Sequence, residues 1–114
     1  GDITELEGDA QATRDFRRRE RESFAAFAGN RWHIDQDFGD FIRASVAASL
    51  GQTDARAAVE AELPKAEAKG WRITSALHRI WAGERDWHVL VEDLDLNSAL
   101  LVKRVLETME EMKK

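Results

Sequence analysis

Cysteine and tyrosine are absent from the 114 residues, and there is a single proline. Without cysteine the chain has no disulfide, no thiolate-ligated zinc or iron–sulfur cluster, and no thiol nucleophile, a composition that fits a reducing compartment. The shortage of proline and the absence of Asn-Gly or Asp-Gly between alternating apolar runs argue against β-hairpins. No apolar run approaches the ~18 residues of a membrane-spanning helix. We therefore expect an all-α protein without a membrane partner.

The composition that remains favours one folded domain. Apolar residues make up 43% of the chain, and four Trp and five Phe provide large areas for burial. A chain of this length forms a single core. The N-terminus has no basic stretch followed by an apolar one, so no secretory signal is expected and a cytoplasmic location is predicted. We expect a tail over residues 1–8 and a compact bundle of five or six helices over 9–114.

Apolar periodicity and glycine stops divide the first half of the chain. A helix is expected over 9–28 and is ended by Gly29. A short connection over 30–35 leads into a helix over 37–50, whose apolar face recurs every three or four residues until Gly51. The first helix carries its aromatic residues on one face: Phe16, Phe24 and Phe27.

The second half shows the same punctuation. A helix over 53–69 contains Pro64, which predicts either a kink or a new helix that begins near this proline. A second helix is expected over 71–82, then a very short one, and then a last helix over 96–112 that is apolar around most of its circumference. The expected stops are Gly70 and Gly83, and the expected caps are Asp86 and either Asp95 or Asn97.

A weak internal repeat links two of these segments. A shift of 32 positions aligns Gly51-Gln52-Thr53-Asp54 with Gly83-Glu84-Arg85-Asp86. One interpretation is two stacked helical hairpins, over 37–69 and 72–94, flanked by the first and last helices. The other is coincidence, because short helix–glycine–cap connections have few solutions.

One acidic segment has the beginning of a calcium-binding loop but not its end. Asp93, Asp95 and Asn97 have the spacing of the first three oxygen ligands. Ser98 then occupies the position that requires glycine, and Arg104 occupies the position of the bidentate glutamate. Helix capping explains these residues better, so no metal and no cofactor is predicted.

Catalytic motifs are also missing. No pair among the three histidines, His33, His78 and His88, has the i,i+4 spacing of a helical metal site. The sequence contains neither a Gly-x-Ser-x-Gly elbow nor a glycine-rich phosphate loop. We predict that the protein is not an enzyme.

The leading prediction is a protein–protein interaction or assembly module, bound either to another protein or to itself. Its basis is the apolar surplus of the last helix together with the phenylalanines of the first helix and the tryptophans near Gly83, since aromatic residues dominate binding hot spots. The residues predicted to bind the partner are Phe24, Phe27, Trp81, Trp87, Leu101, Val105 and Met109.

Two other functions stay open. A small-molecule ligand could enter between helices lined by Trp and Met, with His78 or His88 as its polar contact. Alternatively, the one concentration of positive charge could bind a polyanion, although acidic residues are interleaved with it and the whole chain is acidic, so nucleic acid is the weaker prediction. The arginines in question are Arg14, Arg17, Arg18 and Arg21.

The stretch from Leu63 to Leu106 resembles helical segments of bacterial multidomain proteins of the tetratricopeptide-repeat and signal-transducing NTPase (STAND) type. The residues that carry the resemblance are Gly70-Trp71-Arg72-Ile73, the run Ala76-Leu77-His78-Arg79-Ile80-Trp81-Ala82-Gly83-Glu84-Arg85-Asp86, and Leu94-Asp95 followed by Ser98-Ala99-Leu100-Leu101-Val102. The resemblance implies an assembly role beside a sensor or effector domain in a bacterial signalling or defence protein.

Overall fold

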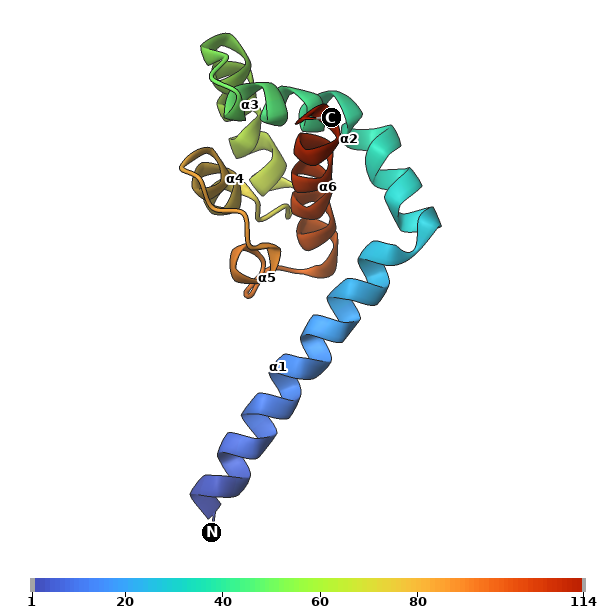
Figure 1. Ribbon diagram of the computed structural model, residues 1–114, viewed down its shortest axis with the longest axis vertical. Coiled ribbons are helices and arrows are strands. Elements are labelled where there is room, and N and C mark those ends of the chain that lie inside the picture. Colours follow the sequence, from blue (N-terminus) through green and yellow to red (C-terminus); the bar gives the residue numbers. More distant parts are fainter. Residues whose placement is uncertain (1, 114) are drawn as a thin grey trace.

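Six helices succeed one another in the computed structural model, which describes the backbone of residues 2–113 and the side chains of residues 12–112 (Figure 1). They are α1 (Asp2–Ala26), α2 (Ala28–Ser49), α3 (Thr53–Ala68), α4 (Thr74–Trp81), α5 (Trp87–Leu90) and α6 (Leu96–Lys113). No strand occurs within residues 2–113. The predicted all-α bundle of five to six helices is therefore confirmed. None of the described helices is long and apolar enough to cross a membrane.

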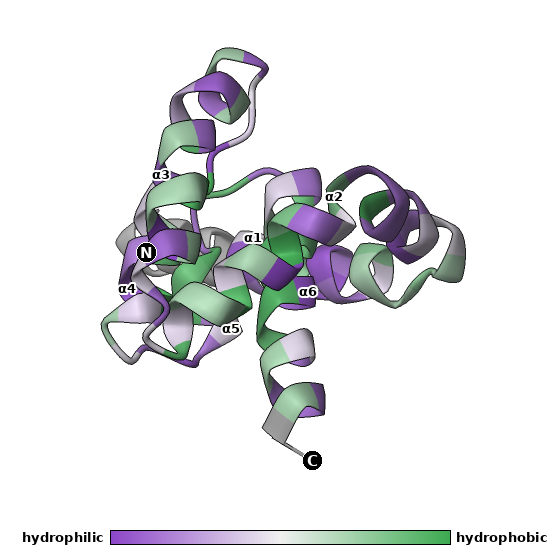
Figure 2. Ribbon diagram, turned by 90° about the horizontal axis from the view of Figure 1, so that it is seen from above, coloured by the Kyte–Doolittle hydropathy of each residue, from purple (hydrophilic) through white to green (hydrophobic). Residues whose placement is uncertain are grey.

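The last helix, α6, forms the centre of the core. It packs against α1, α2 and α5, so most of its circumference is covered by the rest of the chain. Hydrophobic residues accordingly gather along α6 in the middle of the molecule (Figure 2). Its buried side chains are Leu100, Leu101, Val102, Val105 and Met109. The apolar surplus of this helix is thus used inside the domain.

Most of the predicted helix boundaries are present. Gly51, Gly70 and Gly83 all have positive φ, between 96° and 117°, and each follows the end of a helix. Asp86 caps α5 by accepting hydrogen bonds from the backbone N–H groups of His88 and Val89. Asp95 accepts a hydrogen bond of 3.1 Å from the Ser98 N–H in the first turn of α6.

The first half differs from expectation at both ends of the first helix. The helix begins at Asp2, so residues 2–8 are helical backbone and the expected tail is not seen among the described residues. The break falls at the extended residue Phe27, and α2 starts at once, so the predicted connection over 30–35 is wrong. Gly29, the expected stop, lies inside α2.

The predicted pair of equal helical hairpins is also absent. Helices α2 and α3 are 22 and 16 residues long and pack against each other. Their counterparts α4 and α5 have only eight and four residues, and they pack mainly on α2 and α6 respectively. Pro64 causes no break, because α3 continues through it to Ala68. The repeat is therefore limited to the glycine stops and caps.

Candidate functional site

The largest exposed apolar surface follows α1 to its junction with α2. Phe16 and Phe27 are each 63% exposed, and the half-buried Phe24 and Leu96 lie between them and the core. Together with polar neighbours they line a groove of about 730 Å³, which we call the corner groove. Its lining residues are Phe16, Arg19, Glu20, Ser23, Phe24, Phe27, Asn30 and Leu96.

The groove exists because α1 packs on the core with its opposite side. Along a helix of 3.6 residues per turn, positions 18, 21, 22 and 25 face one way, and positions 16, 20, 23 and 27 face the other. The first set contacts the core: Ala25 is 1% exposed, and Arg21 is 4% exposed. The second set is exposed to solvent. Figure 1 shows that the N-terminal part of α1 projects beyond the other helices.

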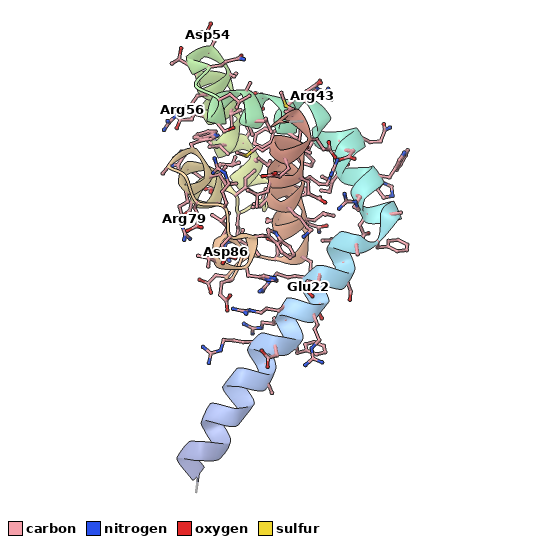
Figure 3. The ribbon with its side chains drawn as sticks, in the orientation of Figure 1. Glu22, Arg43, Asp54, Arg56, Arg79 and Asp86 are labelled. Carbon is pink, nitrogen blue, oxygen red and sulfur yellow. The ribbon has the colours of Figure 1, made fainter. Side chains whose placement is uncertain are left out.

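Polar contacts hold α1 against α5 and the segment that follows it. Glu22 Oε1 lies 3.2 Å from His88 Nε2, at the end of the bundle nearest α1 (Figure 3). Arg18 and Arg21 each place Nη2 3.9 Å from Glu92 Oε2. The Nε and Nη2 atoms of Arg21 are buried without a hydrogen-bond partner among the described residues. These contacts bring little direct hydrogen bonding to the junction.

The sharp turn between α1 and α2 is fixed by side chains of α2. Asn30 donates a hydrogen bond of 3.0 Å to the Phe24 carbonyl, and Arg31 donates one of 3.2 Å to the Ala25 carbonyl. Both carbonyls lie in the last turn of α1, where no intrahelical donor remains. These two contacts cap α1 from outside and keep Phe27 at the edge of the corner groove.

Arg31 also belongs to an ion-pair network that ties α2 to α6. It donates two hydrogen bonds, of 2.9 and 3.1 Å, to Glu107, and Arg104 does the same to Asp35 at 2.8 and 3.2 Å. A further bond of 3.2 Å joins Arg104 to Glu107. Burial by itself would raise the pKa of Glu107, but the hydrogen bonds from Arg31 and Arg104 lower it below its ordinary value. The hydrogen bond to Asp35 raises the pKa of Arg104.

A second groove, of about 440 Å³, lies between α2 and α3. Its apolar part includes Phe38, Phe41 and Trp71, and the Phe38 and Trp71 rings meet edge to face at 4.6 Å. Acidic and basic side chains, among them Asp37 and Lys69, form its rim. A smaller pocket shares Phe38 and Trp71 with this groove and shares Phe24 with the corner groove, so one furrow connects the two.

The predicted partner-binding residues are divided between surface and core. Phe24 and Phe27 line the corner groove as expected. Leu101, Val105 and Met109 are at most 4% exposed, and Trp87 is 8% exposed. As part of an exposed binding surface these four were wrong predictions, because packing inside the domain already covers them.

Both predicted tryptophans have structural contacts. Trp87 donates a hydrogen bond of 2.9 Å to the Ala99 carbonyl, and Lys103 lies over its ring at 4.2 Å. Half-buried Trp81 donates one of 3.1 Å to the Ser45 carbonyl, with Arg56 at 4.9 Å from its ring. These contacts anchor α4 and α5 to the bundle.

The residues that sequence reasoning missed are Phe16, Leu96 and Trp71. Phe16 had been placed on the same helical face as Phe24, which was a usable signal. Leu96 and Trp71 enter their grooves through tertiary packing, for which the local sequence gives no sign.

The arginines proposed for polyanion binding do not share one open face. Arg21 is buried, and Arg18 lies 3.9 Å from the same glutamate as Arg21, on the inner side of α1. Arg14 and Arg17 are exposed to solvent. The polyanion function stays a prediction that this placement does not favour.

The described residues include no group of three His, Cys, Asp or Glu side chains that could hold a metal. His78 pairs with Glu60 at 3.0 Å and His88 with Glu22, so neither histidine lines the α2–α3 groove as a ligand contact. No protein-family model, curated protein or solved structure matches the chain. Its function has to be argued from the surface itself.

Proposed function

We propose that the chain is a non-enzymatic protein–protein interaction or assembly module that binds through the corner groove. The observation that carries this proposal is the pair Phe16 and Phe27, each 63% exposed on the side of α1 that the core does not use. Burying one such side chain contributes about 1.5–3 kcal/mol. Two of them at the edges of one groove, with Phe24 and Leu96 between, are an arrangement typical of a binding hot spot.

The setting of this module is part of the same proposal. A larger bacterial signalling or defence protein is what the resemblance of Leu63–Leu106 to helical segments of tetratricopeptide-repeat and STAND proteins implies. That resemblance is its only support. The corner groove lies mostly outside the resembling stretch, so binding through it is tested independently of the setting.

The test compares two variants with charge placed on equally exposed apolar positions. Phe16→Glu alters the corner groove, and Leu50→Glu alters the end of α2, where Leu50 is 59% exposed. Each chain is immobilised and exposed to extract from the source cells. A protein retained by wild type and by Leu50→Glu, but reduced at least tenfold with Phe16→Glu, supports the proposal.

Circular dichroism and thermal melting establish that both variants remain folded. Retention of the same proteins by all three chains, together with identical masses in solution for all three, would show that the corner groove binds no protein.

A second candidate function is binding of a small apolar molecule between α2 and α3. It is favoured by the groove volume of about 440 Å³ and by the Phe38–Trp71 pair at its wall. A ligand there would shift the emission of Trp71, and Trp71→Phe would remove the shift while leaving the other three tryptophans in place. Unchanged emission and melting temperature across a panel of metabolites would count against this function.

A further inference from the structure

We propose that the corner groove is filled by the same groove of a second copy, so that two α1 helices pair antiparallel about a two-fold axis. This inference rests on the proposed function and names the partner of that site. It starts from the stripe 16, 20, 23 and 27, whose spacing of four, three and four residues is that of a coiled-coil seam. A protein with such a seam on a projecting helix presents a surface suited to a second helix.

The groove contains both halves of a self-complementary contact. Phe16 stands at one end, 63% exposed, and Phe24, Phe27 and Leu96 form the apolar surface at the other. Antiparallel pairing centred between positions 21 and 22 sets Phe16 of each copy against Phe27 of the other. The same register sets Glu20 against Ser23 at the centre. A two-fold axis therefore forms the Phe16–Phe27 contact twice.

The charges in the groove are also self-complementary. Arg19 and Glu20 are its only charged lining residues, and neither forms an ion pair with another side chain of residues 12–112. The printed contact of Arg19 is a bond of 3.5 Å from Nε to the Asp15 carbonyl. The two-fold axis brings Arg19 of each copy alongside Glu20 of the other, which pairs both charges.

The symmetry explains why the association would stop at two. The same patch is used on both copies, and such an isologous interface closes on itself instead of growing into a filament. The inner side of α1, with Arg18, Glu22 and Ala25, keeps its contacts with α5 and α6 in the pair. No rearrangement of the bundle is needed.

The first experiment is the mass of the full chain by light scattering on a sizing column from about 1 µM to 1 mM. We expect a monomer–dimer equilibrium. Phe16→Glu should weaken dimerisation at least tenfold, and Leu50→Glu, with 59% exposure away from the groove, should leave it unchanged. Equal weakening by both variants, or by neither, would overturn the proposal.

A charge exchange provides a second set of variants on solvent-exposed positions. Arg19→Glu faces the partner's Glu20 with a like charge and should weaken the dimer about three- to tenfold. Adding Glu20→Arg to the same chain restores opposite charges across the axis and should restore the dimer. Weakening without recovery in the double variant would contradict the proposed pairing.

The direction of pairing is measured by pulsed electron paramagnetic resonance. Because the chain has no cysteine, Ala12→Cys gives a single attachment point for a nitroxide outside the groove. In the proposed register, position 12 lies opposite position 31 of the partner, so the two labels are separated by 19 residues of helix, or about 30 Å. A distance near 10–15 Å would indicate parallel helices and overturn the proposal.

The outcomes separate this inference from the function it rests on. A monomer at every concentration refutes self-association. If that monomer still retains another protein in a Phe16-dependent way, the corner groove remains an interaction site with a different occupant. If it retains none, the proposed function fails as well.

Discussion

Two fully buried serines differ in what their hydroxyl groups do. Ser98 Oγ accepts a hydrogen bond of 3.0 Å from the Arg72 N–H, which holds the segment before α4 against α6. Ser45 Oγ is equally buried and has no hydrogen-bond partner among the described residues. Ser98→Ala leaves the Arg72 N–H unsatisfied and should lower the free energy of unfolding by about 1–3 kcal/mol, measured by urea titration.

Ser45→Ala is the matched control for that prediction. It removes a polar atom that makes no bond, so the free energy of unfolding should stay the same or rise by up to about 1 kcal/mol. Equal losses for the two variants would mean that the Arg72–Ser98 bond is absent in solution.

Glu107 makes stability depend on acid. Its pKa in the folded protein is lowered, because the hydrogen bonds from Arg31 and Arg104 outweigh the effect of burial. A carboxylate whose pKa is lowered on folding stabilises the protein above its unfolded value of about 4.3, and this contribution is lost as the pH falls through the folded pKa. The stability difference between wild type and Glu107→Gln should therefore be largest at neutral pH and shrink below about pH 4.3. Denaturant titrations from pH 7 to pH 3 measure it, and a difference that grows with acid would contradict the network.

At the scale of helices, two glycines predict opposite effects of the same substitution. Gly39 lies inside α2, and a Cβ there would meet the Arg43 guanidinium at 3.5 Å, an ordinary contact. Gly39→Ala should raise the free energy of unfolding by about 0.5–1 kcal/mol. Gly51 has a φ of 96° in the turn after α2, so Gly51→Ala should lower it by about 1–2 kcal/mol.

Thermal melting of the two glycine variants distinguishes backbone conformation from space. Open space surrounds the Cβ position at Gly51, so a steric clash cannot cause the expected loss. Equal melting temperatures would show that the turn relaxes to negative φ.

Element boundaries were predictable where a local signal decides them. The positive-φ glycines and the Asp86 and Asp95 caps act within a few residues, and the sequence predicted these positions. The break at Phe27 depends instead on Asn30 and Arg31 reaching back to α1, while Arg31 is itself held by Glu107 on α6. Contacts across that many residues leave no local pattern, which is why Gly29 was mistaken for the stop.

For the whole molecule, the same limit applies to the candidate site. The exposed Phe24–Phe27 end was predictable from helical spacing. The sequence also showed that α6 has too much apolar surface for a half-exposed helix, but it left open whether a partner or the rest of the chain covers that surface. The fold answers this for Leu101, Val105 and Met109, which lie in the core. Which side of α1 stays free depends on the contacts of Arg18, Glu22 and Ala25.

The arrangement of α1 on the bundle predicts a gradient of local stability along one continuous helix. Its contacts with the rest of the chain concentrate where Ala25 and Arg21 are buried, and the side chains before Arg18 that the structure describes are largely exposed. A helix without tertiary packing is marginal in water, so its hydrogen bonds open easily. Measured on dilute monomer, amide hydrogen exchange should be fast over residues 12–17 and slow over 21–26.

Ala25→Asp tests whether core contacts create that gradient. A carboxylate in a site that is 1% exposed should release α1, so exchange over residues 19–26 rises to the rate of 12–17, while the amides of α6 around Val105 stay protected. Loss of protection in α6 as well would mean that α1 and the bundle open together. Uniform slow exchange along wild-type α1 would mean that the helix is stable without its packing. The expected pattern, an anchored C-terminal part and a labile N-terminal part, leaves the α1 stripe free to pair with a second helix.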